Sequence, residues 1–313
     1  MNLNDYEHTP VLVDEVLNGL KLRPDGFYVD CTFGRGGHTQ AILDRLGNEG
    51  HILVFDKDPD AIEFARKLAA CDERLLYVQG SFTKLFEEIE RLDQVGKVDG
   101  ILFDLGVSSP QLDNSLRGFS FNKEGELDMR MEPTKGISAA EWINQTEERE
   151  IARVLFEYGE ERYARRIAAK IVGIRNETPI TTTSQLAKII ASAVPKWERD
   201  KHPATRAFQG IRIFINNELE ELRQGLIDAM KVLCIGGRLL VISFHSLEDR
   251  IVKRFMRDLA TADPYPKDLP VTVDLLHPKL RIIGKLIKPG SEELENNPRS
   301  RSARLRIAEV LER

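Results

Sequence analysis

Cysteine is scarce in this sequence, with three residues among 313, at positions 31, 71 and 234. None of them forms a CxxC pair or a cluster with histidine. A disulfide framework and a zinc site are both disfavoured, so we expect a protein of a reducing compartment with no metal. Cys31 is open to two interpretations, a reactive thiol or a small buried side chain.

Long apolar runs are also missing, since no stretch approaches the roughly 18 residues of a membrane span. The opening residues, MNLNDY, lack the basic and apolar regions of a secretory signal. We therefore predict a cytoplasmic protein that does not contact membranes. A net charge of −5 argues against a protein that coats nucleic acid through bulk charge, whereas an apolar content of 42% is ample for a core.

Positive charge is nevertheless concentrated in two stretches. Residues 162–175 hold five basic residues and no acidic one, and residues 279–306 hold eight basic residues against three acidic ones. Basic faces on an acidic protein are typical of a selective polyanion binder. A solvated helix face and a charged tail would give the same two patterns, and the sequence does not separate these interpretations.

Residues 28–39 form the most informative stretch of the chain. An apolar run with β-branched and aromatic residues predicts a buried strand, and Gly34, Gly36 and Gly37 follow it with a tight turn. Helical spacing then begins at Gln40 and ends at Gly47. Strand, glycine turn and helix make the first unit of a doubly wound sheet, with the glycines placed to let a ligand approach the backbone.

The identity of that ligand depends on two further positions. A dinucleotide fingerprint requires a third glycine where this chain has Thr39, whereas Asp56 ends the next predicted strand, where it could accept both ribose hydroxyl protons. This combination favours S-adenosylmethionine over NAD. In the alternative interpretation the glycines only make a turn and Asp56 caps the following helix.

Two more predicted strands end in candidate site residues. The strand at 75–78 leads to Phe82, which could cover an adenine base or serve as a core or lid residue, and the strand at 98–103 ends at Asp104. Ligands of such sheets lie beyond the carboxyl ends of the strands. We therefore expect residues 34–38, Asp56, Phe82 and Asp104 to converge there.

The loop after Asp104 is rich in groups that accept hydrogen bonds. Methyl transfer to an exocyclic amine needs acceptors that hold the amino protons and align the nitrogen with the methyl group. Asp104, Ser108, Ser109 and the carbonyl beside Pro110 are suitable, although an ordinary Ser-Pro turn has the same sequence. His245 follows a later strand and could contact substrate or move a proton, while Ser246 with Asp249 would cap a helix.

The rest of the chain completes the predicted architecture. About 100 residues without strand signals predict an inserted, all-helical domain over 108–210, assigned to substrate recognition, within a discontinuous cofactor-binding domain over 1–107 and 211–313. A long helix over roughly 211–233, a strand over 238–244 and a closing hairpin from 280–287 and 303–310 follow. The fold class is α/β, with a Rossmann-like, mostly parallel sheet of seven strands.

Five motifs together resemble the RsmH (MraW) family of bacterial methyltransferases along the whole chain. They are DCTFGRGGH at 30–38, DLGVSSPQ at 104–111, DMRM at 128–131, ATRAFQ at 204–209 and SFHSLEDR at 243–250. The resemblance implies a class I methyltransferase that uses S-adenosylmethionine to methylate N4 of a cytidine in the decoding P site of 16S ribosomal RNA, in the small subunit. Its cofactor positions fall on Gly36, Gly37, His38, Asp56, Phe82, Asp104 and Gln111, and Gly34 joins them from the turn.

One departure leaves the chemistry open. Other amino-methyltransferases hold the amine with an Asp/Asn/Ser-Pro-Pro-aromatic motif, whereas this loop has a single proline, so the atom that grips N4 is not determined. An extruded base would need a stacking partner, for which Phe119, Phe121 and Trp142 are candidates. An NAD-dependent oxidoreductase and a noncatalytic RNA-binding assembly factor are the rival functions, and the oligomeric state is open, with a homodimer as one option.

Overall fold

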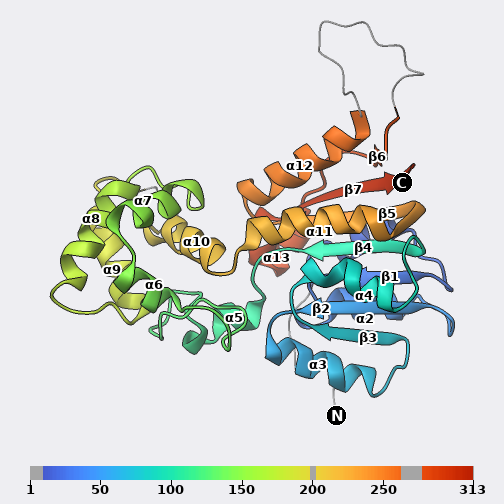
Figure 1. Cartoon of the computed structure of the whole chain (residues 1–313), viewed down its shortest axis with the longest axis horizontal. Helices are drawn as coiled ribbons and strands as arrows, with labels where there is room; N and C mark the ends of the chain where they lie inside the picture. The colour runs from blue at the N-terminus through green and yellow to red at the C-terminus, as the bar shows by residue number, and fades with distance from the viewer. Residues whose placement is uncertain (1–9, 198–201, 262–276, 313) are drawn as a thin grey trace, which may run out of the picture. The chain divides into compact units, whose positions relative to one another are not determined.

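Seven strands form a single sheet in the computed structural model, which describes residues 10–197, 202–261 and 277–312. Their order is β3-β2-β1-β4-β5-β7-β6 (Figure 1), and β1 to β5 run parallel while β7 lies antiparallel between β5 and β6. This confirms the predicted seven-stranded, mostly parallel, Rossmann-like sheet. The strands are β1 (Phe27–Asp30), β2 (His51–Asp56), β3 (Leu75–Gln79), β4 (Val98–Asp104), β5 (Leu233–Ser243), β6 (Leu280–Ile282) and β7 (Arg304–Val310).

One strand begins earlier than its sequence indicates. We expected a turn before residue 238, but β5 already pairs with β4 at Leu233. The irregularity lies within the strand, where Gly236 has φ +82° and the register shifts between Val98 and Gly100. A glycine that permits this conformation therefore marks a bulge rather than the start of the strand.

Apolar side chains alternate between the two faces of the sheet, as the period of a strand requires. In β2, Leu53 and Phe55 point to one buried cluster and Ile52 and Val54 point to the other. The first cluster is covered by α4 (Leu85–Arg91), α11 (Glu218–Val232) and α12 (Ser246–Thr261), and the second by α1 (Val13–Leu20), α2 (Gly37–Leu43) and α3 (Pro59–Ala69). Among the described residues, no helix is long and apolar enough to cross a membrane.

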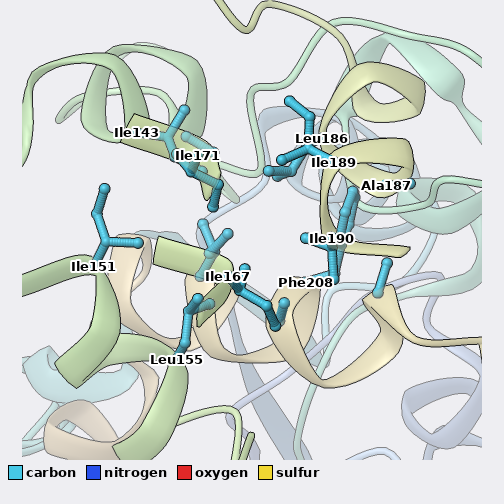
Figure 2. Close-up of a cluster of buried hydrophobic side chains, with 14 of the residues drawn as sticks. Ile143, Ile151, Leu155, Ile167, Ile171, Leu186, Ala187, Ile189, Ile190 and Phe208 are labelled. Atoms are coloured by element: carbon cyan, nitrogen blue, oxygen red, sulfur yellow. The ribbon is translucent and has the colours of Figure 1, made fainter. Parts of the chain in front are cut away.

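The chain divides into two compact units. The sheet unit comprises residues 1–106 and 220–313, and the helical unit comprises residues 107–219. The helical unit contains α5 (Ser109–Asp113), α6 (Ala139–Gln145), α7 (Glu148–Glu157), α8 (Ala164–Arg175), α9 (Thr183–Ala193) and α10 (Ala204–Ile215). Its own core is built from side chains such as Ile167, Ile171 and Phe208, as Figure 2 shows. The expected boundary at residue 210 falls inside α10, because Phe208 and Ile211 of that helix are buried in this core.

The predicted long helix over 211–233 is wrong, because α10 ends at Ile215 and α11 begins at Glu218. Asn217 between them has φ +53°. The Asn216 side chain donates to the carbonyl of Met129 at 2.7 Å and accepts from the backbone N–H of Met131 at 2.7 Å. Asn216 therefore holds the Asp128–Met131 loop, whose Met129 is buried with φ +63°.

We expect Asn216→Ala to lower the free energy of unfolding of the helical unit by about 2–4 kcal/mol. The substitution leaves the Met129 carbonyl and the Met131 N–H without their partner, and each unpaired buried group costs about 1–3 kcal/mol. Trp142 and Trp197, the two tryptophans of the chain, lie in this unit, so urea unfolding followed by tryptophan fluorescence reports on it.

Asn176→Ala is a matched control, because Asn176 is an exposed residue at the end of α8. Its free energy of unfolding should stay within about 0.5 kcal/mol of the wild-type value, as is usual for surface substitutions. Equal midpoints for the two variants would contradict the role assigned to Asn216.

Candidate cofactor and catalytic site

The carboxyl ends of four parallel strands carry the polar residues of the candidate site. Asp30 ends β1, Asp56 ends β2, Asp104 ends β4 and Ser243 ends β5. Since these strands are neighbours in the sheet, the four ends share one edge, with Asp104 in register with Ile242 of β5. The sheet therefore brings together side chains that are far apart in sequence.

The glycine turn begins earlier than expected, because β1 stops at Asp30 and α2 starts at Gly37. Gly34 and Gly36 have φ values of +56° and +73°, which side chains rarely tolerate. A Cβ at Gly36 would also lie 2.8 Å from the Phe33 ring. The chain thus needs glycine here to turn from the strand into the helix.

Asp56 is held by this turn. Its Oδ2 accepts from the Gly34 backbone N–H at 2.8 Å, and its Oδ1 accepts from the Asp58 N–H at 2.8 Å. The alternative that Asp56 caps the next helix is wrong, because Asp58 does so by accepting from the Asp60 N–H. Burial raises the pKa of Asp56 to about 6, so the group is ionised at neutral pH, and each oxygen keeps a further lone pair to offer a ligand.

Asp104 has one oxygen that faces a histidine and one without a partner. Its backbone N–H donates to Thr32 Oγ1 at 2.6 Å, and its Oδ2 lies 3.5 Å from His38 Nδ1. His38 Nε2 donates to the Val11 carbonyl at 2.8 Å. Asp104 Oδ1 is buried and has no hydrogen-bond partner within the described part of the chain.

The charge of Asp104 is poorly compensated. Burial raises the pKa of Asp104 to about 6, His38 opposes that rise, and the carboxylates of Asp30 and Glu248 add to it. An acceptor with a free oxygen and weak compensation is suited to receive a hydrogen bond from a ligand.

One residue of this edge, Asp30, was not named as a site residue from the sequence. Asp30 is buried and accepts from the Thr39 hydroxyl at 2.7 Å and from the Thr32 N–H at 3.0 Å. Thr39 thus occupies the place of the third glycine and supplies a hydrogen bond to the end of β1. An acidic residue at the end of an apolar strand was the available signal.

His245 lies immediately before α12, which begins at Ser246. Its Nδ1 lies 3.4 Å from the Glu248 N–H, and its Nε2 lies 3.1 Å from Glu248 Oε1, outside hydrogen-bonding geometry. Glu248 is buried and accepts from the backbone N–H groups of Phe244 and His245 at 2.8 and 3.2 Å. Glu248, which the sequence did not single out, therefore orients the loop that carries His245.

Asp249 does not form the expected helix cap with Ser246. The Asp249 carboxylate instead accepts from Arg304 at 2.9 Å and from Arg306 at 2.7 Å, both on β7. These two arginines lower its pKa against the effect of burial. Two basic residues of the stretch at 279–306 therefore form ion pairs with a carboxylate of the sheet unit.

The family model for the MraW methylase family matches residues 5–311. The chain belongs to the MraW methylase family. It is therefore an S-adenosylmethionine-dependent rRNA methyltransferase with a Rossmann-like class I fold. Membership also weighs against the NAD-dependent and noncatalytic alternatives.

Solved methyltransferase structures are similar to this chain at low identity. An rRNA methylase from Streptococcus thermophilus matches at 11% identity and TM-score 0.40, over 97% of this chain and 99% of that one. NSun6 from Pyrococcus horikoshii matches at 13% identity and TM-score 0.46, over 100% of this chain and 56% of that one. Fibrillarin from Aeropyrum pernix, with bound S-adenosyl-L-methionine, matches at 11% identity and TM-score 0.40, over 95% of this chain and 73% of that one. The order of the sheet shows the fold, and the family shows the activity.

At two of the implied cofactor positions of this MraW family member, the side chain packs in the core or caps a helix. The Phe82 ring meets the Phe103 ring edge-on at 5.2 Å and packs against Gly225 of α11, which favours the core interpretation of the ring. Gln111 is buried, and its Oε1 accepts from the Ser108 N–H at 3.0 Å. Ser108 precedes α5, so the Ser-Pro turn starts a helix, and Ser108, Ser109, Pro110 and Gln111 all belong to the helical unit.

The three candidate stacking aromatics also have structural roles. Phe119 and Trp142 are buried in the core of the helical unit, which leaves no ring face for a base. The half-buried Phe121 ring lies 4.6 Å from the His202 ring and 4.9 Å from the Phe208 ring. The expectation that Phe119 or Trp142 stacks on a base is wrong, because both help to bury the helices around them.

Proposed function

We propose that this protein transfers the methyl group of S-adenosylmethionine to N4 of a cytidine in the decoding P site of 16S rRNA, within the small ribosomal subunit. The family supplies the reaction and the class of substrate. The single structural observation that carries the finer assignment is Asp104 Oδ1, a buried carboxylate oxygen at the ligand edge of the sheet that has no hydrogen-bond partner among the described residues. We place the reaction in the cytoplasm.

The residues at this edge fit the methyl donor. Gly34 and Gly36 leave the turn free of side chains, and the lone pairs that Asp56 keeps can accept from two ribose hydroxyls. When bound, S-adenosylmethionine supplies a methyl group that its sulfonium already makes electrophilic. We therefore assign Gly34, Gly36, Gly37, His38, Asp56 and Asp104 to the donor site, and we keep Phe82 and Gln111 as the further cofactor positions that the family resemblance implies.

Asp104 is our choice for the group that orients the amine. The N4 lone pair of cytosine is delocalised into the ring, so an acceptor that holds an amino proton is needed to align the nitrogen for in-line attack. Above a pH of about 6 the Asp104 carboxylate is ionised and accepts strongly. After transfer, the cationic nitrogen loses a proton to this carboxylate or to water.

The other proposed groups act around that step. His38 faces the second oxygen of Asp104, and His245 is held by Glu248 beside the end of β5, where it is placed to contact substrate or move a proton. Ser108, Ser109 and the carbonyl beside Pro110 stay sequence-based candidates for further acceptors of the amine. The sulfonium needs no activation by a metal, so we assign none to the reaction.

A labelled methyl donor tests the proposal directly. Purified protein, small subunits that lack the modification, and S-adenosylmethionine with a deuterated methyl group should give one N4-trideuteromethylcytidine per 16S rRNA, detected by mass spectrometry of nuclease digests. Naked 16S rRNA serves as the second substrate form. Label on another base or on C5 of cytosine would refute the N4 assignment, and binding without any label would support a noncatalytic assembly factor.

A further inference from the structure

One face of α8 carries positive charge that the fold does not use. Ala164, Ile167, Ala168 and Ile171 are buried against the helical core. At 100° per residue, Arg165, Arg166, Ala169, Lys170 and Gly173 lie together on the opposite side of the helix, and all five are exposed. We call these five residues the α8 cationic face.

The remaining basic residues of this stretch have partners. Arg175 donates to the Ile143 carbonyl at 2.5 Å, and the Arg162 guanidinium lies over the Tyr163 ring at 6.0 Å. By contrast, Arg165, Arg166 and Lys170 make no hydrogen bond or ion pair with any described residue. Three cations are thus presented to solvent without an ion-pair partner in the described part of the chain.

The shape of the face suits an extended polyanion. Between the cations lie Ala169 and Gly173, and a Cβ added at Gly173 would meet no atom within 4 Å. A backbone can therefore approach the helix closely there. Arg166 and Lys170 are separated by about 6 Å along the helix axis, roughly one turn. Arginine forks bind phosphate oxygens in a bidentate manner, and lysine adds a point charge.

We propose that the α8 cationic face contacts the phosphate backbone of rRNA away from the methylated nucleotide. This inference rests on the proposed function, because it names the surface by which the same substrate is held. RNA is favoured over an acidic protein because the face exposes no large apolar or aromatic side chain, and such side chains anchor the centres of protein interfaces.

The test compares two triple variants of the full-length protein. The first is Arg165→Gln with Arg166→Gln and Lys170→Gln, which removes three charges and keeps good helix formers. The matched control is Arg66→Gln with Lys67→Gln and Arg91→Gln, three exposed basic residues on α3 and α4 that pair with Glu63 or Glu88. Both variants change the net charge equally, so bulk charge is controlled.

Binding to small subunits with radiolabelled 16S rRNA is measured at several KCl concentrations and constant Mg²⁺. Each phosphate contact contributes about 0.7–0.9 to the slope of log K against log salt, so the first variant should lose about two to three from that slope. Its Kd at low salt should rise about tenfold or more. The control should change Kd by less than about twofold, and calorimetric binding of S-adenosylhomocysteine should be unaltered in both.

The outcomes separate this inference from the proposed function. An unchanged slope in the first variant, or an equal loss in the control, overturns the phosphate contact and leaves the face to an acidic protein partner. If the wild type binds with the expected slope and the first variant loses it, the contact stands. Absence of N4-methylcytidine from the labelled assay would then count against the proposed reaction alone.

Discussion

Replacing Asp104 with asparagine should reduce methyl transfer about a hundredfold or more while making the folded protein more stable at neutral pH. The loss of activity follows because the variant removes the charged acceptor proposed to align N4, and removal of one such electrostatic group typically costs 10²–10³ in rate. The gain in stability follows because Oδ1 of the half-buried wild-type carboxylate is itself buried and has no hydrogen-bond partner among the described residues.

The sign of the stability change depends on pH in a defined way. The folded protein raises the pKa of Asp104 to about 6 from the ordinary value of 3.8, so ionisation is penalised in the folded state. This penalty is absent below pH 3.8, grows between 3.8 and about 6, and is complete above it. Asp104→Asn should therefore add about 1–3 kcal/mol to the free energy of unfolding at pH 7.5 and much less at pH 4.5.

Asp249→Asn is the matched control with the opposite sign. Asp249 is also a buried carboxylate of the sheet unit, but Arg304 and Arg306 lower its pKa, so its charge stabilises the fold at neutral pH. This variant should be less stable than wild type at pH 7.5. Since both tryptophans lie in the helical unit, hydrogen exchange of β1 and β4 is the suitable probe. Full activity, or equal stability gains at pH 4.5 and 7.5, would refute the account of Asp104.

Replacing Asp56 with alanine should weaken binding of S-adenosylhomocysteine by two orders of magnitude or more. A hydrogen bond to a charged group contributes about 1.5–3 kcal/mol, and the proposed role of Asp56 involves two such bonds to the ribose. The substitution also frees the Gly34 N–H that now fixes the glycine turn. Isothermal titration calorimetry measures the effect, and unchanged affinity would eliminate the ribose assignment.

Two further variants separate binding from folding in this experiment. Asp56→Asn keeps one carbonyl oxygen for the turn, so its affinity for S-adenosylhomocysteine should lie between those of the wild type and of Asp56→Ala. Asp58→Asn retains a good N-cap for α3 and should change affinity less than about threefold. In the wild type, affinity should fall as pH drops through about 6, because protonated Asp56 accepts hydrogen bonds more weakly.

The sheet was predictable because each strand has a recognisable pattern in its local sequence. Apolar runs end in an acidic residue at Asp56 and Asp104, and the carboxyl ends of parallel strands must share an edge. The closing hairpin and the helical insertion were also foreseen. These features depend on residues that are close in sequence, so a single chain is enough to read them.

Two of the failures concern partners that are distant in sequence. The helix over 211–233 breaks because Asn216 bonds to Met129 and Met131, more than 80 positions earlier. Asp249 sits at a perfectly good capping position, yet arginines 55 and 57 positions later hold it. Neither local propensity nor spacing carries such information, because tertiary contacts override both.

The neighbours β4 and β5 have a consequence for synthesis of the protein on the ribosome. They pair directly in the sheet, yet the whole helical unit is encoded between them. At about 5–20 residues per second, a nascent chain spends on the order of ten seconds making that insertion, with the open edge of β4 waiting for its partner. We expect the helical unit, which has a core of its own, to fold during this interval, before the half-finished sheet that will hold the methyl donor is closed.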